Sequence, residues 1–261
     1  PKTPQELETI SRRLISQGKV KYGYVWQGKQ YEGLSCVFLE IVNGFGGNWI
    51  NKNGKVQLNS IASIEAISWL SKLINDGISP KSVISFTENE SLQAFESGSA
   101  AFMRNWPYAW RELEKESSSV KGKFGVTTMV AKKGYKPSAT LGSWGFSILA
   151  SSQNKADTFK VIEFLTSPQS QEKLFVDFGY SPVSKQLYEN QKLVENYPIL
   201  KVLKRGLDHT KTRPQTPIYA QISSELQRGL SKILTNKQQA SEAMNYAHSN
   251  TQAILKSAGG Y

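Results

Sequence analysis

The motif MRNWPYAW at residues 103–110 most constrains how this chain can fold. An apolar run at residues 100–103 precedes it and predicts a buried strand, while residues 108–114 are typical of a helix. Pro107 suits the first position of a helix, where its missing N–H is not needed, and Asn105 can cap the helix start. We therefore expect a strand-to-helix corner at one end of a sheet, which is where open α/β sheets bind ligands.

The aromatic side chains of this corner allow two interpretations. Trp106, Tyr108 and Trp110 offer flat rings with polar edges, which suit a ligand with apolar faces and many hydroxyls, such as a sugar. The same rings could instead fill a core at the corner. The motif taken alone favours neither interpretation.

Strand and helix patterns alternate up to residue 165, which predicts an α/β fold with a mostly parallel sheet. Capping boxes at residues 3–6 and 87–90 mark two helix starts, and residues 51–54 predict a hairpin turn. The expected strands are residues 20–26, 100–103, 124–130 and 144–150. The expected helices are residues 4–17, 31–44, 61–75, 87–98, 108–114, 156–165, 172–178, 191–205, 217–234 and 238–256.

Cysteine and histidine are too scarce for several kinds of chemistry. Cys36 is the only cysteine, which excludes an intrachain disulfide and a cysteine-based metal site. The two histidines, His209 and His248, fall in polar segments, and we expect both to be solvated surface residues. This leaves little for catalytic Cys/His chemistry or zinc binding. We expect no catalytic residues, no cofactor and no metal.

The formal net charge of +11 raises the question of an anionic partner. The basic residues are spread along the chain, and no zinc finger, RNA-binding sheet signature or continuous basic helix accompanies them. We therefore expect no nucleic-acid partner. No run approaches the roughly 20 apolar residues needed to cross a membrane, and no signal-peptide pattern is present. Because the chain begins at Pro1, we expect that residues upstream were removed, so the missing signal says little about the compartment.

Four motifs, taken together and in this order, resemble a known family. They are WQGKQYEGL at residues 26–34, RNWPY at 104–108, GSWGF at 142–146 and RPQTP at 213–217. The set is similar to the extracellular solute-binding proteins (family 1) of ABC transporters that take up maltose, trehalose and related sugars. The resemblance covers almost the whole chain.

The resemblance implies a periplasmic-binding-protein-like II fold of the α/β class, of which this chain holds the C-terminal lobe with a helical C-terminal region. Residues 1–134 and 185–261 would form that lobe, and residues 135–184 would belong to the N-terminal lobe, whose first part precedes this chain. The strand expected at 144–150 and the helix expected at 156–165 would then lack sheet partners. Their apolar faces must find other cover or remain exposed.

The resemblance also implies aromatic ligand-binding residues. Trp106 and Tyr108 match a corner that stacks on sugar rings, and Trp144 matches an aromatic side chain of the binding-site wall. Gly145 would let the backbone approach the ligand. Ser143 departs from the family pattern, which often has a second glycine there, and this puts the fine specificity in doubt. Three of the remaining tryptophans are expected to be structural: Trp26, Trp49 and Trp69. Trp110 is expected either in the core or directly behind the ligand-contacting residues.

The polar ligand-binding residues implied by the resemblance are Arg213, Glu32 and Tyr31. Arg213 would donate to sugar hydroxyls, because its fork of donors fits paired oxygens better than a lysine does. Glu32, beside Tyr31 at a helix start, either accepts from sugar hydroxyls or caps its own helix. Arg104 faces either the ligand or a carboxylate of the protein.

The leading hypothesis is therefore a non-enzymatic, monomeric protein that binds a di- or oligosaccharide between two lobes and delivers it to ABC permease subunits. It would act in the periplasm or at the extracellular face of the membrane. A glycoside-processing enzyme is an alternative, but it requires paired carboxylates, and Glu32, Glu40, Glu112 and Glu114 form no recognisable acid/base pair. An interaction module that uses the basic surface is the other alternative.

Overall fold

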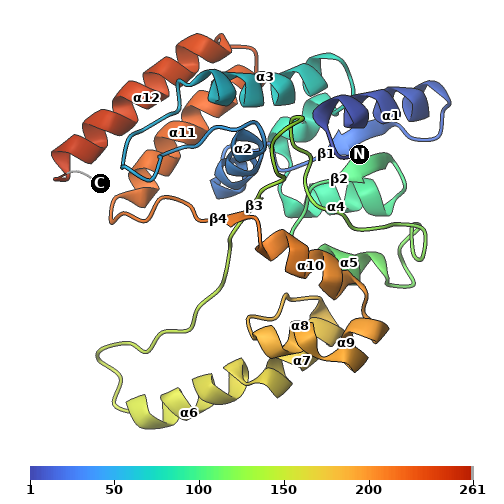
Figure 1. Cartoon of the computed structure of the whole chain (residues 1–261), viewed down its shortest axis with the longest axis vertical. Coiled ribbons are helices and arrows are strands. Elements are labelled where there is room, and N and C mark those ends of the chain that lie inside the picture. Colours follow the sequence, from blue (N-terminus) through green and yellow to red (C-terminus); the bar gives the residue numbers. More distant parts are fainter. Residues whose placement is uncertain (260–261) are drawn as a thin grey trace. The chain divides into compact units, whose positions relative to one another are not determined.

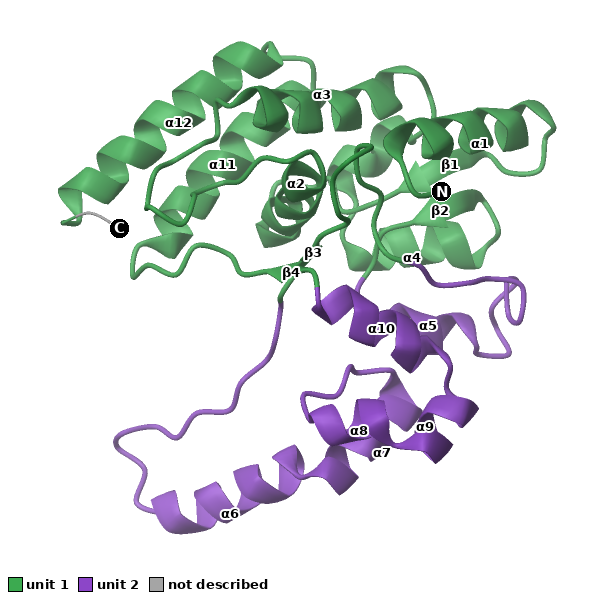
Figure 2. Cartoon of the chain, in the orientation of Figure 1, with its two compact units in different colours: residues 1–105, 128–141, 209–261 green, residues 106–127, 142–208 purple. Residues whose placement is uncertain are grey.

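The computed structural model describes residues 1–259, which form two compact units. Unit 1 comprises residues 1–105, 128–141 and 209–261, and unit 2 comprises residues 106–127 and 142–208 (Figure 2). The chain thus passes from one unit to the other four times. These units are defined by compactness, and the assignment of segments to lobes stays a prediction.

Unit 1 contains six of the twelve α-helices and all the strands of the described residues (Figure 1). Its elements are α1 (Pro4–Ser16), β1 (Tyr22–Val25), α2 (Glu32–Gly44), α3 (Ile61–Asn75), the 3-10 helix η1 (Lys81–Ser85), α4 (Glu88–Glu96), β2 (Ala100–Met103), β3 (Ala139–Thr140), β4 (Thr210–Lys211), α11 (Tyr219–Leu234) and α12 (Ala240–Ser257).

The core of unit 1 lies around α2, which packs against α3 and α11. Almost every residue of α2 is buried, because its apolar side chains continue around the helix instead of forming one stripe. α12 covers α11 and α3. Trp26, Trp49 and Trp69 are buried in this core, as the sequence predicts for structural tryptophans.

Local capping explains where several of these helices begin. Thr3 accepts from the backbone N–H of Glu6 at 3.2 Å, and the Thr87 N–H donates to the Glu90 carboxylate at 2.6 Å. Side chains that satisfy the first free N–H groups fix a helix start from neighbouring residues alone. The helix starts predicted from the two capping boxes, those of α1 and α4, are therefore confirmed.

The strands form two separate parallel pairs within the described residues. β1 pairs with β2 in the register Tyr22↔Ala100 and Val25↔Met103, and the short strands β3 and β4 pair with each other. The predicted parallel pairing is confirmed for β1 and β2. The sequence did not predict β3 or β4, because two-residue strands show no periodicity.

Two predicted strands are wrong, and the predicted hairpin forms only in part. Residues 124–130 and 144–150 are not β-strands, because no neighbouring strand offers them hydrogen bonds. The turn at residues 51–54 is present, but a single antiparallel bridge between Ile50 and Val56 is all that flanks it.

Unit 2 is helical. Its elements are α5 (Ala109–Leu113), α6 (Lys155–Thr166), α7 (Pro168–Phe178), α8 (Lys185–Glu189), α9 (Gln191–Asn196) and α10 (Ile199–Leu207). The single helix predicted for residues 191–205 is wrong: it is divided into α9 and α10 at Pro198, which cannot donate an intrahelical hydrogen bond. No helix within residues 1–259 has the length and apolar character needed to span a membrane.

A small aromatic core holds unit 2 together. The Trp110 ring lies 5.5 Å from Phe175 and 5.9 Å from Tyr197 between ring centroids, and Phe175 meets Tyr197 edge-on. Trp110 is buried, which fits the predicted position in the core. Aromatic pairs in this geometry stabilise beyond their buried area.

Residues 142–150 and α6 expose large apolar side chains. Trp144 is 99% exposed and Phe164 is 70% exposed, and Phe146, Leu149, Phe159 and Val161 are exposed as well. The sequence predicted that these faces would find other cover or remain exposed. In this structure these apolar side chains remain exposed.

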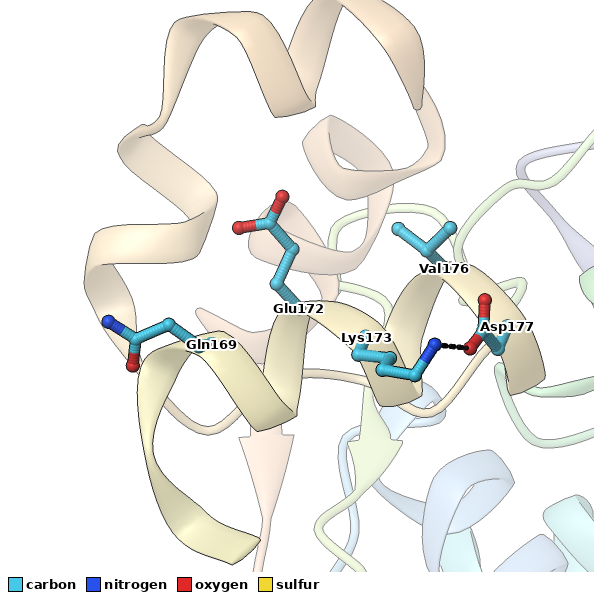
Figure 3. Close-up of a pocket in the computed structure, with 5 residues that line it drawn as sticks. All are labelled: Gln169, Glu172, Lys173, Val176 and Asp177. Atoms are coloured by element: carbon cyan, nitrogen blue, oxygen red, sulfur yellow. Dashed lines mark hydrogen bonds and ion pairs between the residues drawn. The ribbon is translucent and has the colours of Figure 1, made fainter. Parts of the chain in front are cut away.

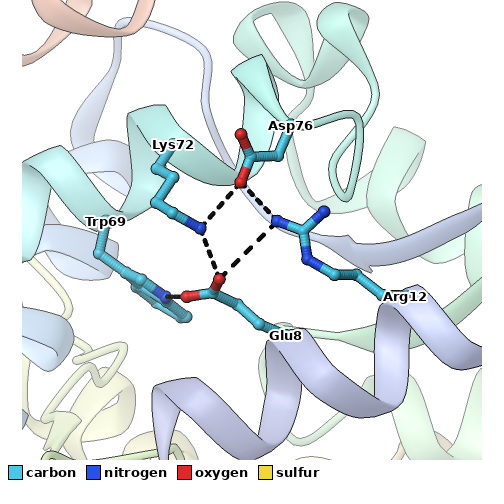
Figure 4. A network of polar contacts seen from close by, with 5 residues as sticks. All are labelled: Glu8, Arg12, Trp69, Lys72 and Asp76. Carbon is cyan, nitrogen blue, oxygen red and sulfur yellow. Dashed lines mark hydrogen bonds and ion pairs between the residues drawn. The ribbon is translucent and has the colours of Figure 1, made fainter.

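An ion-pair network on unit 1 joins α1 to α3 (Figure 4). Glu8 accepts from Lys72 at 2.6 Å and from the Trp69 indole at 3.0 Å, while Asp76 accepts from Arg12 and Lys72. The hydrogen bond from Lys72 lowers the pKa of Asp76 below its ordinary value. Such exposed pairs stabilise weakly one by one, but together they orient α1 on α3.

Candidate functional site

A polar cluster surrounds Glu32 at the first residue of α2. Arg213 Nη1 donates to Glu32 Oε1 at 2.9 Å, Ser223 Oγ donates to Oε2 at 2.7 Å, and the Tyr219 hydroxyl donates to Oε1. We call these four residues the Glu32 cluster. The side chains of Glu32 and Arg213 are 38% and 32% exposed. The cluster therefore offers charged donors and acceptors to solvent while it is anchored in the protein.

Two further contacts hold the cluster in place. Ser223 Oγ lies 2.9 Å from Ser35 Oγ, which joins α11 to α2, and the Arg213 guanidinium lies over the Tyr219 ring, 5.8 Å from its centroid. Burial, and then the hydrogen bond to Glu32, raises the pKa of Tyr219. Burial, the largest single cause, lowers the pKa of Arg213, but the hydrogen bond to Glu32 and the charges of neighbouring groups together outweigh it, so the net shift is upward. The tyrosine thus stays a hydroxyl donor and the arginine a cation.

The sequence predicted Glu32 and Arg213 as site residues but missed their two partners. Tyr219 and Ser223 are four residues apart at the start of α11, which puts them on one helix face. That spacing was the available signal. Glu32 accepts three hydrogen bonds from other elements, and neither prediction for it, a ligand acceptor or a cap of its own helix, included these partners.

Tyr31 contacts a different element. Its hydroxyl donates to Glu88 Oε2 at 2.9 Å at the start of α4, and its ring lies against Gly33, where a Cβ would meet the hydroxyl at 2.1 Å. Burial, followed by the hydrogen bond to Glu88, raises the pKa of Tyr31. Tyr31 is half-buried, and its role in ligand binding stays a prediction.

The predicted aromatic corner begins unit 2. Trp106 and Tyr108 are half-buried in the turn before α5, which begins at Ala109. The prediction that Pro107 is the first helical residue and Asn105 its cap is wrong. The Asn105 amide instead donates to the Glu88 carbonyl at 3.0 Å, because an acceptor on α4 lies within its reach.

The glycine motif meets the aromatic corner within unit 2. A Cβ at Gly142 would lie 3.1 Å from the Trp106 ring, so the missing side chain lets the ring lie against the backbone. A Cβ at Gly145 would meet nothing within 4 Å, and Trp144 projects into solvent. Trp106 therefore contacts Gly142, whereas Trp144 is exposed to solvent and Gly145 has free space around its Cα.

Arg104 binds a carboxylate of the protein. Its Nε and Nη2 atoms donate to the two oxygens of Glu40 at 2.8 and 2.5 Å, and both residues are buried. The sequence left this partner open. Burial, the largest single cause, lowers the pKa of Arg104, but the charge of Glu40 and its hydrogen bonds, with smaller contributions from Cys36 and Tyr24, together outweigh it, so the net shift is upward.

In the part of the chain that the structure describes, neither a metal site nor the open hollow on unit 2 adds to the candidate site. Within residues 1–259, no group of three or more His, Cys, Asp or Glu side chains is arranged to hold a metal ion. An open hollow on α7 of unit 2 is lined by Gln169, Glu172, Lys173, Val176 and Asp177 (Figure 3). Two of these lining residues, Lys173 and Asp177, form an ion pair with each other at 2.8 Å. None of the predicted ligand-binding residues lines the hollow.

Solved structures share the fold of this chain. The maltose-bound MalE3 of T. maritima is 32% identical, with a TM-score of 0.92 over 98% of this chain and 66% of its own. A solute-binding protein of Thermotoga lettingae bound with α-D-tagatose is 24% identical, with a TM-score of 0.87 over 97% of this chain and 64% of its own. The strand pairs and helices described above therefore have the periplasmic-binding-protein-like fold.

The chain belongs to the bacterial extracellular solute-binding protein family, whose model matches residues 1–172. A probable ABC transporter-binding protein of Deinococcus radiodurans is 35% identical over 246 residues, which are 91% of this chain and 58% of that protein. The chain thus spans about three fifths to two thirds of the length of these relatives.

Proposed function

We propose that this chain is part of the substrate-binding component of an ABC importer and that the ligand is a sugar. The observation that carries the proposal is the 32% identity with maltose-bound MalE3 over 98% of the chain. Membership of the solute-binding family supports the transport role. The proposed class of ligand is a di- or oligosaccharide of the maltose or trehalose type, held between two lobes.

The chemistry of the Glu32 cluster supports a hydroxyl-rich ligand. A carboxylate, a guanidinium and a tyrosine hydroxyl lie within one half-exposed group, and each can exchange a protein partner for a sugar hydroxyl. We therefore propose Glu32 and Arg213 as ligand-binding residues and add Tyr219 to them.

The remaining predicted residues complete the proposal. Trp106, Tyr108 and Trp144 would stack on sugar rings. Gly145 would let the backbone approach the ligand, and Tyr31 would bind the ligand from the start of α2. These residues are divided between the two units, and Trp106 is tested by its own variant.

The proposed partners are the permease subunits of the importer, reached from the periplasm or the extracellular face of the membrane. The protein would act as a monomer, without nucleic acid, and would release its sugar unchanged. Transport by such a component needs binding and release but no covalent step.

The test is calorimetric titration of the full-length protein with maltose, trehalose, maltotriose, tagatose and ribitol. Binding of a di- or oligosaccharide with at least about tenfold preference over the monosaccharide and the polyol is expected. Recovery of the bound sugar unchanged after prolonged incubation checks the absence of turnover. A protein that binds none of the five ligands would contradict the proposal, and cleavage of any of them would replace it with an enzyme.

A further inference from the structure

Glu40 and Arg104 form a buried ion pair at the centre of unit 1. They are the two charged side chains among the fully buried residues of the part that the structure describes, and each is 3% exposed. The carboxylate receives two parallel hydrogen bonds from the guanidinium. A buried pair usually stabilises a fold no more than well-packed apolar residues of similar volume would. A contribution to the stability of the fold therefore does not by itself explain why a charged pair is buried here.

The pair also fixes two other segments. Arg104 Nη1 donates to Gln27 Oε1 at 2.8 Å, and Gln27 Nε2 donates back to the Arg104 carbonyl at 3.0 Å. The backbone N–H of Thr140 donates to Glu40 Oε1 at 3.2 Å, and the Thr140 hydroxyl donates to the Cys36 carbonyl at 2.9 Å. One carboxylate on α2 thus holds the end of β2 and the end of β3.

These two segment ends are the places where the chain leaves unit 1. Unit 1 is interrupted after Asn105 and after Leu141, and the chain returns to it at Thr128 and then at His209. Arg104 and Thr140 each precede an interruption by one residue. The returning chain is tied to the same place, because β4 pairs with β3 and the Leu141 N–H donates to the Lys211 carbonyl at 2.8 Å.

Each departing segment carries aromatic residues of the proposed ligand site. Trp106 follows Arg104 by two residues, and Trp144 follows Thr140 by four. A short segment inherits its starting point and direction from the residue that anchors it. Small displacements of ligand-contacting groups cost affinity steeply, so the anchor matters for binding even though it contacts no ligand.

We propose that Glu40 is a positioning residue that fixes, through Arg104 and Thr140, the starting points of both segments that carry the aromatic ligand-binding residues. The effect on affinity rests on the function proposed above. The effect on the two segment ends does not, and it can be measured without any ligand.

The test compares three variants of the full-length protein. The double variant Glu40→Leu/Arg104→Met removes both buried charges and keeps similar volume, so the fold is expected to survive. Glu65→Leu/Lys132→Met removes an exposed pair of unit 1 with a similar contact distance, 2.7 Å, and serves as the matched control. Thr140→Val removes only the hydroxyl bond at one segment end and is the milder second variant.

The first readout is affinity set against stability. For the Glu40→Leu/Arg104→Met variant we expect the Kd for maltose to rise about tenfold or more, while the melting temperature stays within about 5 °C of the parent. The control variant is expected to change neither quantity beyond those limits. A purely structural role would change the melting temperature and the affinity together, or neither.

The second readout is amide hydrogen exchange in the ligand-free protein. The amides of Arg104, Thr140 and Leu141 have the named acceptors Val25 O, Glu40 Oε1 and Lys211 O. We expect their exchange to accelerate about tenfold in the double variant while amides inside α3 keep their parent rates. In Thr140→Val, acceleration is expected at Thr140 and Leu141 but not at Arg104.

The outcomes separate the two proposals. Unchanged exchange at both segment ends in a folded double variant would overturn the role of Glu40, as would unchanged affinity for maltose. If the parent protein binds no sugar, the proposed function fails, and the exchange rates alone decide the role of Glu40. If the double variant does not fold, the single variant Glu40→Gln, which keeps the volume but loses the charge, takes its place: faster exchange at both segment ends supports the proposal, and no acceleration overturns it.

Discussion

Arg213 and Glu32 form an ion pair with a contact of 2.9 Å although 181 residues separate them in the chain. Glu32 begins α2, and Arg213 lies between β4 and α11. The pair is half-exposed, so it adds little to the free energy of unfolding. In the proposed function, the pair holds a guanidinium and a carboxylate side by side so that both bind the sugar.

Replacing Arg213 by lysine is expected to weaken sugar binding by about 1–3 kcal/mol, because lysine keeps the charge but loses the planar fork of donors. The free energy of unfolding should change by less than about 1 kcal/mol. Titration calorimetry and urea unfolding measure the two quantities. Arg228→Lys is the control, since the exposed Arg228 also pairs with a carboxylate, that of Glu225 on α11. Equal losses of affinity in both variants would argue against a ligand-binding Arg213.

Two tryptophans four residues apart should respond in opposite ways to truncation. Trp106→Ala is expected to cost about 1–3 kcal/mol of sugar affinity with little loss of stability, because the ring is half-buried at a turn. Trp110→Ala should lower the free energy of unfolding of unit 2 by about 3–5 kcal/mol, since its ring packs on Phe175 and Tyr197. Calorimetric titration and thermal unfolding of each variant test this. Unchanged affinity in Trp106→Ala would exclude Trp106 from the ligand site.

The Cys36 thiol should be inert in the native protein. Burial raises its pKa to about 12, with smaller opposing contributions from neighbouring charges. At about pH 8 the thiolate, which is the reactive form, is therefore scarce and also shielded. Mass spectrometry of the peptide that contains Cys36 should show no labelling by a disulfide reagent in buffer and complete labelling in guanidinium chloride. Rapid labelling of the folded protein would contradict the buried position.

His248 on α12 should titrate below its ordinary pKa of about 6.5. Burial lowers its pKa first, and the nearby Lys55 lowers it further. Because the unfolded chain binds the proton more readily, the stability contributed by neutral His248 is present above about pH 6.5 and declines as the pH falls toward the folded pKa. NMR titration of the imidazole, with urea unfolding at several pH values, measures both effects. In His248→Gln this part of the pH dependence should vanish, and a parent pKa above 6.5 would contradict the assignment.

His248 also shows where sequence reasoning was too simple. A polar helix predicted solvated histidines, but His248 is half-buried, and its Nδ1 atom is enclosed. The helices themselves were predicted well, because caps such as Thr87 and breaks such as Gly77 act through neighbouring residues. Pro198 carried an equally local signal, and the single helix predicted across it ignored that signal.

The failed strands and the missed contacts have a common cause. Residues 144–150 have a strand-like sequence, but a strand also needs a partner, and nothing local reports whether one exists. The contact of Arg104 with Glu40 spans 64 residues, and that of Tyr219 with Glu32 spans 187. The family resemblance suggested Glu32 and Arg213 as site residues, whereas their mutual contact depends on how α2 and α11 pack, which no local pattern determines.

The packing of α2 against α11 has a consequence for the order of synthesis. Ser35 on α2 meets Ser223 on α11 after 188 further residues have been added. At ordinary rates of about 5–20 residues per second, the ribosome takes roughly 10–40 s to make that stretch. During this interval the apolar surface of α2 lacks its final cover. The nascent chain therefore presents a strongly apolar helix early and completes its core late, which is the situation in which a chaperone that holds unfolded chains is most useful.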